Sequence, residues 1–188
     1  MADWEFEHSA ESKAPPGDIW ELYTDVENWH EWSKGVEESS LDGEFEPGSK
    51  GKVKAPNLPR TGFELVEVEP ERSFVSKAGM PGGTLKLEHT IEAADGGSRI
   101  THRATFDGAL SFIWVPLVGR IVKRELPESV ERLAELAVEK EEEAQKEKER
   151  KEERAARMKE ADEQFKEEIK KTSRGEGKDA GGASLPGG

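Results

Sequence analysis

The chain opens with a regular alternation of apolar and charged positions. Over residues 3–12 every second side chain is apolar or a histidine, and most of the side chains between them are acidic. A period of two places alternate side chains on opposite faces of a strand, so that one face is buried and the other meets solvent. The pattern predicts a half-buried strand with an inward face made of Trp4, Phe6, His8 and Ala10.

The period becomes helical directly after this strand. Two prolines suit the end of the strand and the first turn of a helix, because proline lacks the N–H that a first turn leaves unpaired. Apolar side chains then recur at helical spacing, and a possible capping segment at residues 25–28 leads to two tryptophans three positions apart. We expect two short helices, the first starting at Pro15 and Pro16, with a buried face that carries Ile19, Leu22, Tyr23, Trp29 and Trp32.

Strand candidates separated by glycine and proline turns follow at about residues 35–43, 50–56, 61–69, 72–79, 84–94 and 98–107. Because short turns join them, the pattern predicts an antiparallel meander. The strongest hairpin signal is the segment 95–98, Asp-Gly-Gly-Ser, since glycine tolerates positive φ. If Asp95 pairs with Ser98, His89 lies opposite Ala104 and diagonal to His102 on the buried face.

From about Pro116 the apolar positions return to helical spacing. Pro127 lies inside this pattern, where its ring should kink the helix or mark a join between two helices. An apolar stripe on such a helix would pack on the sheet. The stripe consists of Val118, Ile121, Val122, Leu126, Val130, Leu133 and Ala137.

The chain changes character near residue 139. Between residues 139 and 154 only Ala144 and Gln145 are uncharged, so no face of this segment would be buried and we expect a solvated helix over 139–172. Residues 158–169 carry a weak apolar line that would suit a protein partner or self-association as a coiled coil; the plainer alternative is a solvated, partly frayed helix. Residues 173–188 are rich in glycine, serine and proline and are expected to be disordered.

Charge and residue usage exclude several classes of protein. Residues 1–138 carry 26 acidic against 15 basic residues, so nucleic acid and anionic lipid surfaces are unlikely partners. The chain has no cysteine, which excludes disulfides and a cysteine nucleophile. Residues 1–20 contain five acidic side chains and no apolar run, so we expect a cytoplasmic protein without a signal peptide, and no run is long enough to span a membrane.

Several short motifs, in this order, resemble one known family. They include Ala14-Pro15-Pro16, Asn28-Trp29-x-x-Trp32, the segments 48–51, 95–97 and 99–103, and Leu126-Pro127-Glu128-Ser129-Val130. The order is similar to that of the polyketide cyclase/dehydrase and lipid-transport branch of the START-like superfamily, over about residues 1–138. His30 stands where members commonly have proline, a departure confined to one turn. The resemblance implies an α+β helix-grip fold, with a bent antiparallel sheet of about seven strands gripped by a long C-terminal helix, here extended by a charged helical tail.

Three of the four histidines are predicted on inward faces. In the fold that the resemblance implies, the strands carrying His8, His89 and His102 are neighbours, so the rings would converge. Buried neutral histidines are candidates for general acid or base catalysis, but equally for core side chains that hydrogen-bond one another. No carboxylate shares these faces to complete a coordination shell, so no metal site is expected.

A second group of candidates would line an apolar cavity between the sheet and the gripping helix. Large rings suit a ligand pocket, although they suit an ordinary core equally well. The aromatic side chains in question include Trp20, Tyr23, Trp29 and Phe112. The ligand-binding residues that we expect are Trp32, Phe63, Leu87, His89, His102, Ala104, Phe106, Trp114 and Ile121.

Motif searches narrow the function without deciding it. The sequence has no Walker-type phosphate loop, no Gly-x-Gly-x-x-Gly, no Gly-x-Ser-x-Gly and no His-Glu-x-x-His, so neither a cofactor nor one of these catalytic centres is expected. The resemblance implies binding of a hydrophobic small molecule: a polyketide, a lipid or an aromatic metabolite. The alternatives are an aromatase/cyclase-type lyase or dehydratase that uses a pocket histidine, and a co-chaperone-like adaptor that acts through the charged tail.

Overall fold

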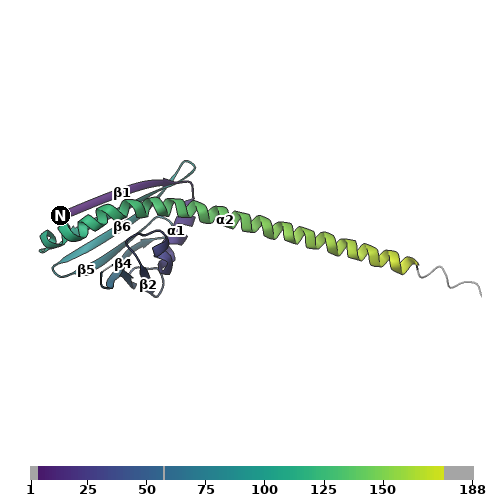
Figure 1. Ribbon diagram of the computed structural model, residues 1–188, viewed down its shortest axis with the longest axis horizontal. Helices are drawn as coiled ribbons and strands as arrows, with labels where there is room; N and C mark the ends of the chain where they lie inside the picture. The colour runs from purple at the N-terminus through teal and green to yellow at the C-terminus, as the bar shows by residue number, and fades with distance from the viewer. Residues whose placement is uncertain (1–3, 57, 176–188) are drawn as a thin grey trace, which may run out of the picture. The chain divides into compact units, whose positions relative to one another are not determined.

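The computed structural model describes residues 4–56 and 58–175 of the chain (Figure 1). The first described elements are strand β1 (Trp4–Ser12), helix α1 (Pro16–Thr24) and the 3-10 helix η1 (Val26–Glu31). The remaining elements are β2 (Glu38–Asp42), β3 (Lys50–Lys54), β4 (Thr61–Glu69), β5 (Ser73–Met80), β6 (Gly83–Ala94), β7 (Gly97–Asp107) and α2 (Ser111–Gly175).

The strands form one seven-stranded sheet in the order β1-β7-β6-β5-β4-β3-β2, with every neighbouring pair antiparallel. Consecutive strands from β2 to β7 pair in a meander, and β1 joins it beside β7. The sheet, the long C-terminal helix and the α+β class confirm the predicted helix-grip fold. Each strand candidate also coincides with an observed strand, with ends that differ by up to three residues.

The register predicted for the β6–β7 hairpin is wrong by two residues. Ala94 pairs with Gly97, so the loop is Asp95-Gly96 and His89 lies directly opposite His102. Gly96 supplies the positive φ of the turn, at +79°. Gly97 is the first residue of β7, and the position requires glycine because a Cβ there would lie 2.0 Å from the carbonyl oxygen of Ser12 at the end of β1.

The two short helices cover part of one face of the sheet. Ile19, Leu22 and Tyr23 of α1 are buried, as their spacing predicts. Asp25 ends α1 and begins η1, and its carboxylate accepts two hydrogen bonds from the Asn28 side chain at 2.9 and 3.1 Å. Trp29 follows within η1 and is buried in the core.

Helix α2 supplies the rest of the cover, and it packs on the same core as α1 and η1 (Figure 1). The helix begins five residues before the predicted start at Pro116 and contains both Pro116 and Pro127. The predicted alternative of a join between two helices at Pro127 is therefore wrong, since α2 is a single helix. Its contacts with the core are concentrated at Leu126, Val130, Leu133, Ala134, Leu136 and Ala137.

The chain divides into two compact units, residues 1–142 and 143–188. In the second unit every side chain described, up to residue 170, is exposed, including Met158, Phe165 and Ile169. The expected disordered tail lies outside the described residues from 176 onward, and residues 173–175 belong to α2. Within the described ranges, none of the helices has the length and apolar character that crossing a bilayer requires.

Candidate functional site

A cavity of about 220 Å³ lies inside the first unit, between the sheet and α2. The sheet contributes one wall, η1 and the loop after it contribute a second, and α2 contributes the third. The lining residues are Trp29, Trp32, Ser33, Gly35, Val36, Val53, Ser76, Leu87, Glu88, His89, His102, Ile121, Val122, Glu125, Leu126 and Ser129.

A row of three histidines crosses the sheet beside this cavity. His8 pairs with His102 across β1 and β7, and His102 pairs with His89 across β7 and β6. The rings of His89 and His102 lie 4.3 Å apart, and His89 stacks on Phe74 of β5 at 4.0 Å. His8 is half-buried, and its Nε2 lies 3.5 Å from the Glu131 carboxylate. The structure therefore places His89 and His102 at the cavity wall and His8 behind it.

Tyr23 connects α1 to this row. Its hydroxyl lies 2.7 Å from Nε2 of His102, in a hydrogen bond that is entirely buried. The Tyr23 ring also meets the edges of Phe74 and His89, at centroid distances of 5.0 and 5.6 Å. A buried hydroxyl without a partner is costly, so this bond specifies how α1 docks on the sheet.

Burial keeps these groups uncharged. Desolvation lowers the pKa of His89 to about 3, and the neighbouring Phe74 backbone only partly opposes this shift. The pKa of His102 is also well below its ordinary value, first because of burial and then because of His89 and His8. Burial raises the pKa of Tyr23. At neutral pH the two imidazoles at the cavity wall are therefore neutral, and the Tyr23 phenol bonded to His102 behind them keeps its proton.

Two polar atoms at the cavity have no hydrogen-bond partner among the described residues. They are Nε1 of Trp32 and Nδ1 of His89, both shielded from solvent. The neighbouring Trp29 differs, since its Nε1 donates to the backbone carbonyl of Tyr23 at 2.9 Å. Buried polar groups in native proteins are nearly always paired, so these two atoms are exceptions within the described core.

At one side of the cavity, α2 meets the loop that follows η1. Ser129 of α2 ties the two together, because its hydroxyl accepts from the backbone N–H of Lys34 at 3.1 Å and donates to the Glu125 carbonyl at 2.8 Å. Gly35 approaches closely here, and a Cβ at that position would lie 2.6 Å from Oε2 of Glu125. The Glu125 carboxylate, which also lines the cavity, is paired with Arg124 at 2.7 Å.

Five of the residues expected to bind ligand line the cavity: Trp32, Leu87, His89, His102 and Ile121. Phe63 is buried behind the wall, where it stacks on Trp29 at 5.5 Å. Ala104 and Phe106 are buried on β7 outside the lining. Trp114 lies away from the cavity, with its Nε1 bonded to the Pro81 carbonyl at 2.9 Å.

Sequence reasoning missed much of the lining on the loop and on α2. Ser33, Gly35 and Val36 lie in an irregular segment without periodicity, which carries no signal of inward orientation. The inward position of Ser76 could have been predicted, because Ser76 lies two residues from the buried Phe74 on the same strand and so shares its face. Glu125 and Ser129 flank the apolar stripe of the helix, and a wider stripe would have included them.

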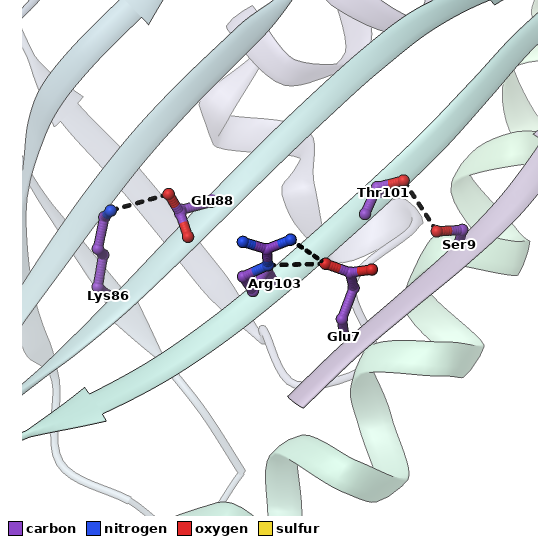
Figure 2. A network of polar contacts seen from close by, with 6 residues as sticks. All are labelled: Glu7, Ser9, Lys86, Glu88, Thr101 and Arg103. Atoms are coloured by element: carbon purple, nitrogen blue, oxygen red, sulfur yellow. Dashed lines mark hydrogen bonds and ion pairs between the residues drawn. The ribbon is translucent and has the colours of Figure 1, made fainter. Parts of the chain in front are cut away.

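The opposite face of the sheet carries a polar network rather than a site. Figure 2 shows Arg103 of β7 bonded through two guanidinium nitrogens to Glu7 of β1, at 2.6 and 2.7 Å, while Lys86 pairs with Glu88 along β6 at 2.8 Å. Ser9 and Thr101 share a hydrogen bond beside them. Parity along the strands predicts the outward position of Arg103. Across the described ranges, no group of three or more His, Asp or Glu side chains is arranged to hold a metal ion.

Comparisons with solved structures identify related folds at low sequence identity. The crystal structure of Ara h 8.0201 aligns with a TM-score of 0.59 and 17% identity, covering 72% of this chain and 98% of that protein. Norcoclaurine synthase from Thalictrum flavum aligns with a TM-score of 0.57 and 14% identity, over 72% and 87% of the two chains. The di-domain ARO/CYC StfQ of the steffimycin biosynthetic pathway aligns at 0.60 and 13% identity, over 72% of this chain and 51% of its own.

A comparison with curated proteins found no match. The family model described as polyketide cyclase / dehydrase and lipid transport, in contrast, matches residues 3–138. This range contains every strand and the whole cavity lining. The chain therefore belongs to the polyketide cyclase/dehydrase and lipid transport family.

Proposed function

We propose that this chain binds a hydrophobic small molecule in the cavity between the sheet and α2. The observation that carries the proposal is the composition of the lining, in which tryptophan, leucine, isoleucine and valine side chains surround a few polar groups. Ligand sites in proteins have this character, because apolar area supplies affinity and a few polar groups fix orientation. Membership of a family described by polyketide chemistry and lipid transport supports the same assignment.

The size of the cavity favours a compact ligand over a long acyl chain. At about 220 Å³ it falls below the range of roughly 300–1,000 Å³ that is typical of drug-sized pockets. Trp29 and Trp32 present large flat surfaces to this space, at a centroid distance of 6.0 Å from each other. Of the three ligand classes that the resemblance implies, an aromatic metabolite or a small polyketide therefore fits better than a lipid.

Catalysis by a pocket histidine has less support than binding. A general acid or base works best when its pKa lies near the working pH, whereas burial holds the pKa of His89 at about 3. His102 is shifted in the same direction and is already bonded to Tyr23. We therefore place a cyclase or dehydratase activity second, and an adaptor function through residues 139–172 third, since no contact made by that segment favours it.

The proposal is tested by fluorescence titration of the full chain with N-phenyl-1-naphthylamine, an uncharged apolar probe. We expect saturable binding at one probe per chain. Leu87→Trp should weaken binding at least tenfold, because the larger ring would occupy the cavity that Leu87 lines.

Leu85→Trp is the matched control. Leu85 lies two residues away on the same face of β6 and is also half-buried, but it does not line the cavity. Probe affinity should therefore change little in this variant. Absence of saturable binding to the unmodified chain, or equal weakening in both variants, would contradict the proposal.

A further inference from the structure

The first two turns of α2 expose large apolar side chains to solvent. Phe112 is 70% exposed, Ile113 is 50% exposed and Leu117 is 58% exposed, and none of the three lines the cavity. Spacings of one, four and five residues place them on one side of the helix, within an arc of about 140°. Large exposed apolar patches mark surfaces that bind a protein or a membrane. This side of α2 is therefore a candidate interaction surface.

The next two turns carry basic side chains on the same side of the helix. Arg120, Lys123 and Arg124 are exposed, and their positions fall within the same arc. Arg124 pairs with Glu125, but its own side chain remains 70% exposed. The outer face of α2 is thus apolar at the start of the helix and cationic one to two turns further on. It consists of Phe112, Ile113, Pro116, Leu117, Arg120, Lys123 and Arg124.

The charge of this segment is opposite in sign to that of the domain around it. Residues 108–124 contain three basic and no acidic residues, whereas residues 1–138 carry 26 acidic against 15 basic residues. The net charge alone argues against an anionic partner, but exposed charges more than about 10 Å apart are largely screened at 0.1 M salt. The local cationic face therefore dominates at a contact. It also disfavours a second copy of the chain, because a symmetrical contact would bring two cationic faces together.

The order of side chains along α2 matches the layers of a phospholipid surface. Ile113 and Arg120 lie about 10 Å apart along the helix axis, at 1.5 Å per residue. The headgroup region of one leaflet is roughly 5–8 Å thick. Apolar turns placed at the acyl boundary would therefore bring the basic groups, on their flexible stems, to the phosphates. This match favours a lipid surface over an acidic protein.

We propose that the outer face of α2 docks the chain on an anionic phospholipid surface, with its apolar side chains inserted and its basic side chains at the phosphates. The apolar side chains supply affinity, and the basic ones supply the preference for anionic lipid. The docking is peripheral, since no helix in the described part of the chain could cross a bilayer. It requires no ligand in the cavity, and so it goes beyond the proposed function.

Cosedimentation of the full chain with vesicles tests the proposal. We expect binding to vesicles of equal parts phosphatidylcholine and phosphatidylglycerol, and much weaker binding to phosphatidylcholine alone or in high salt. Phe112→Ser combined with Leu117→Ser should weaken binding at least tenfold, because two inserted side chains are lost. Phe165→Ser combined with Met158→Ser is the matched control and should bind as the unmodified chain does. These residues are 62% and 66% exposed but lie in the second unit.

The basic side chains have a separate test. Arg120→Gln combined with Lys123→Gln should remove most of the preference for anionic vesicles, since each basic group near the surface contributes to it. Arg154→Gln combined with Arg157→Gln removes the same charge from exposed positions of the second unit and should leave the preference intact.

A label at the start of α2 reports insertion directly. The chain has no cysteine, so Ile113→Cys provides a single attachment site for acrylodan, whose emission shifts to the blue in an apolar environment. We expect that shift with anionic vesicles, and none from the same label at Phe165→Cys. Absence of vesicle binding, equal binding to both vesicle types, or equal loss in the variants and their controls would overturn the proposal. A dimer that disappears in Phe112→Ser combined with Leu117→Ser would assign the face to a second copy and overturn it as well.

Discussion

Tyr23 and His102 illustrate at the scale of single residues how the core accommodates polar atoms. Each would be costly to bury alone, but the 2.7 Å bond between them satisfies both in one contact. The inward positions of the three histidines could be predicted from strand parity, and the burial of Tyr23 from helical spacing. The hydrogen bond itself could not be predicted, because it joins two residues that are 79 positions apart. Their contact depends on the angle at which α1 docks on the sheet, which periodicity does not encode.

The neutral state of His89 predicts a pH dependence of folding. Its folded pKa of about 3 lies below the ordinary value of 6.5, so the unfolded chain binds more protons between these values and stability falls as pH decreases through that window. One such group changes the free energy of unfolding by up to about 1.4 kcal/mol per pH unit there. His89→Phe should reduce this slope by up to one proton in urea unfolding at pH 4.5–6.5. An unchanged slope in a folded His89→Phe would contradict the neutral, buried state of His89.

At the scale of elements, the sequence was sufficient for the order and faces of the strands but not for their registration. Alternation identified the buried faces of β6 and β7, because parity depends only on neighbouring residues. The register depended on whether Gly97 lies in the turn or in the strand, and alternation cannot distinguish the two because a shift of two residues keeps the same faces. The cavity residues on the loop after η1 escaped prediction for a similar reason, since Ser129 of α2 positions that loop.

The two glycines of the hairpin should therefore respond differently to substitution. Gly97→Ala would force the Cβ against the Ser12 carbonyl, so we expect a loss of about 2–3 kcal/mol in unfolding free energy, as for other core overpacking. Gly96→Ala meets no atom within 4 Å and should cost only about 1 kcal/mol, from the positive φ. Thermal and urea unfolding of both variants measure the difference. A larger loss of unfolding free energy in Gly96→Ala than in Gly97→Ala would contradict this account of the hairpin.

At the scale of the whole molecule, we propose that the cavity-bearing unit folds without the charged segment. From residue 141 to residue 170 every side chain is exposed, so this part of α2 buries little apolar area that would stabilise the first unit. A chain ending at Glu142 should keep its cooperative unfolding and a midpoint within about 2 °C of the full chain. Loss of a cooperative transition would show that residues 143–188 contribute to the core.

The central claim is that the cavity between the sheet and α2 holds a hydrophobic small molecule. The most direct measurement is a backbone amide NMR titration of the full chain with 2-acetylnaphthalene. We expect saturable shifts concentrated in η1, residues 33–36, the middle of β6 and residues 121–129 of α2, which together contain most of the lining. Shifts that do not saturate, or that lie mainly outside these segments, would contradict the claim.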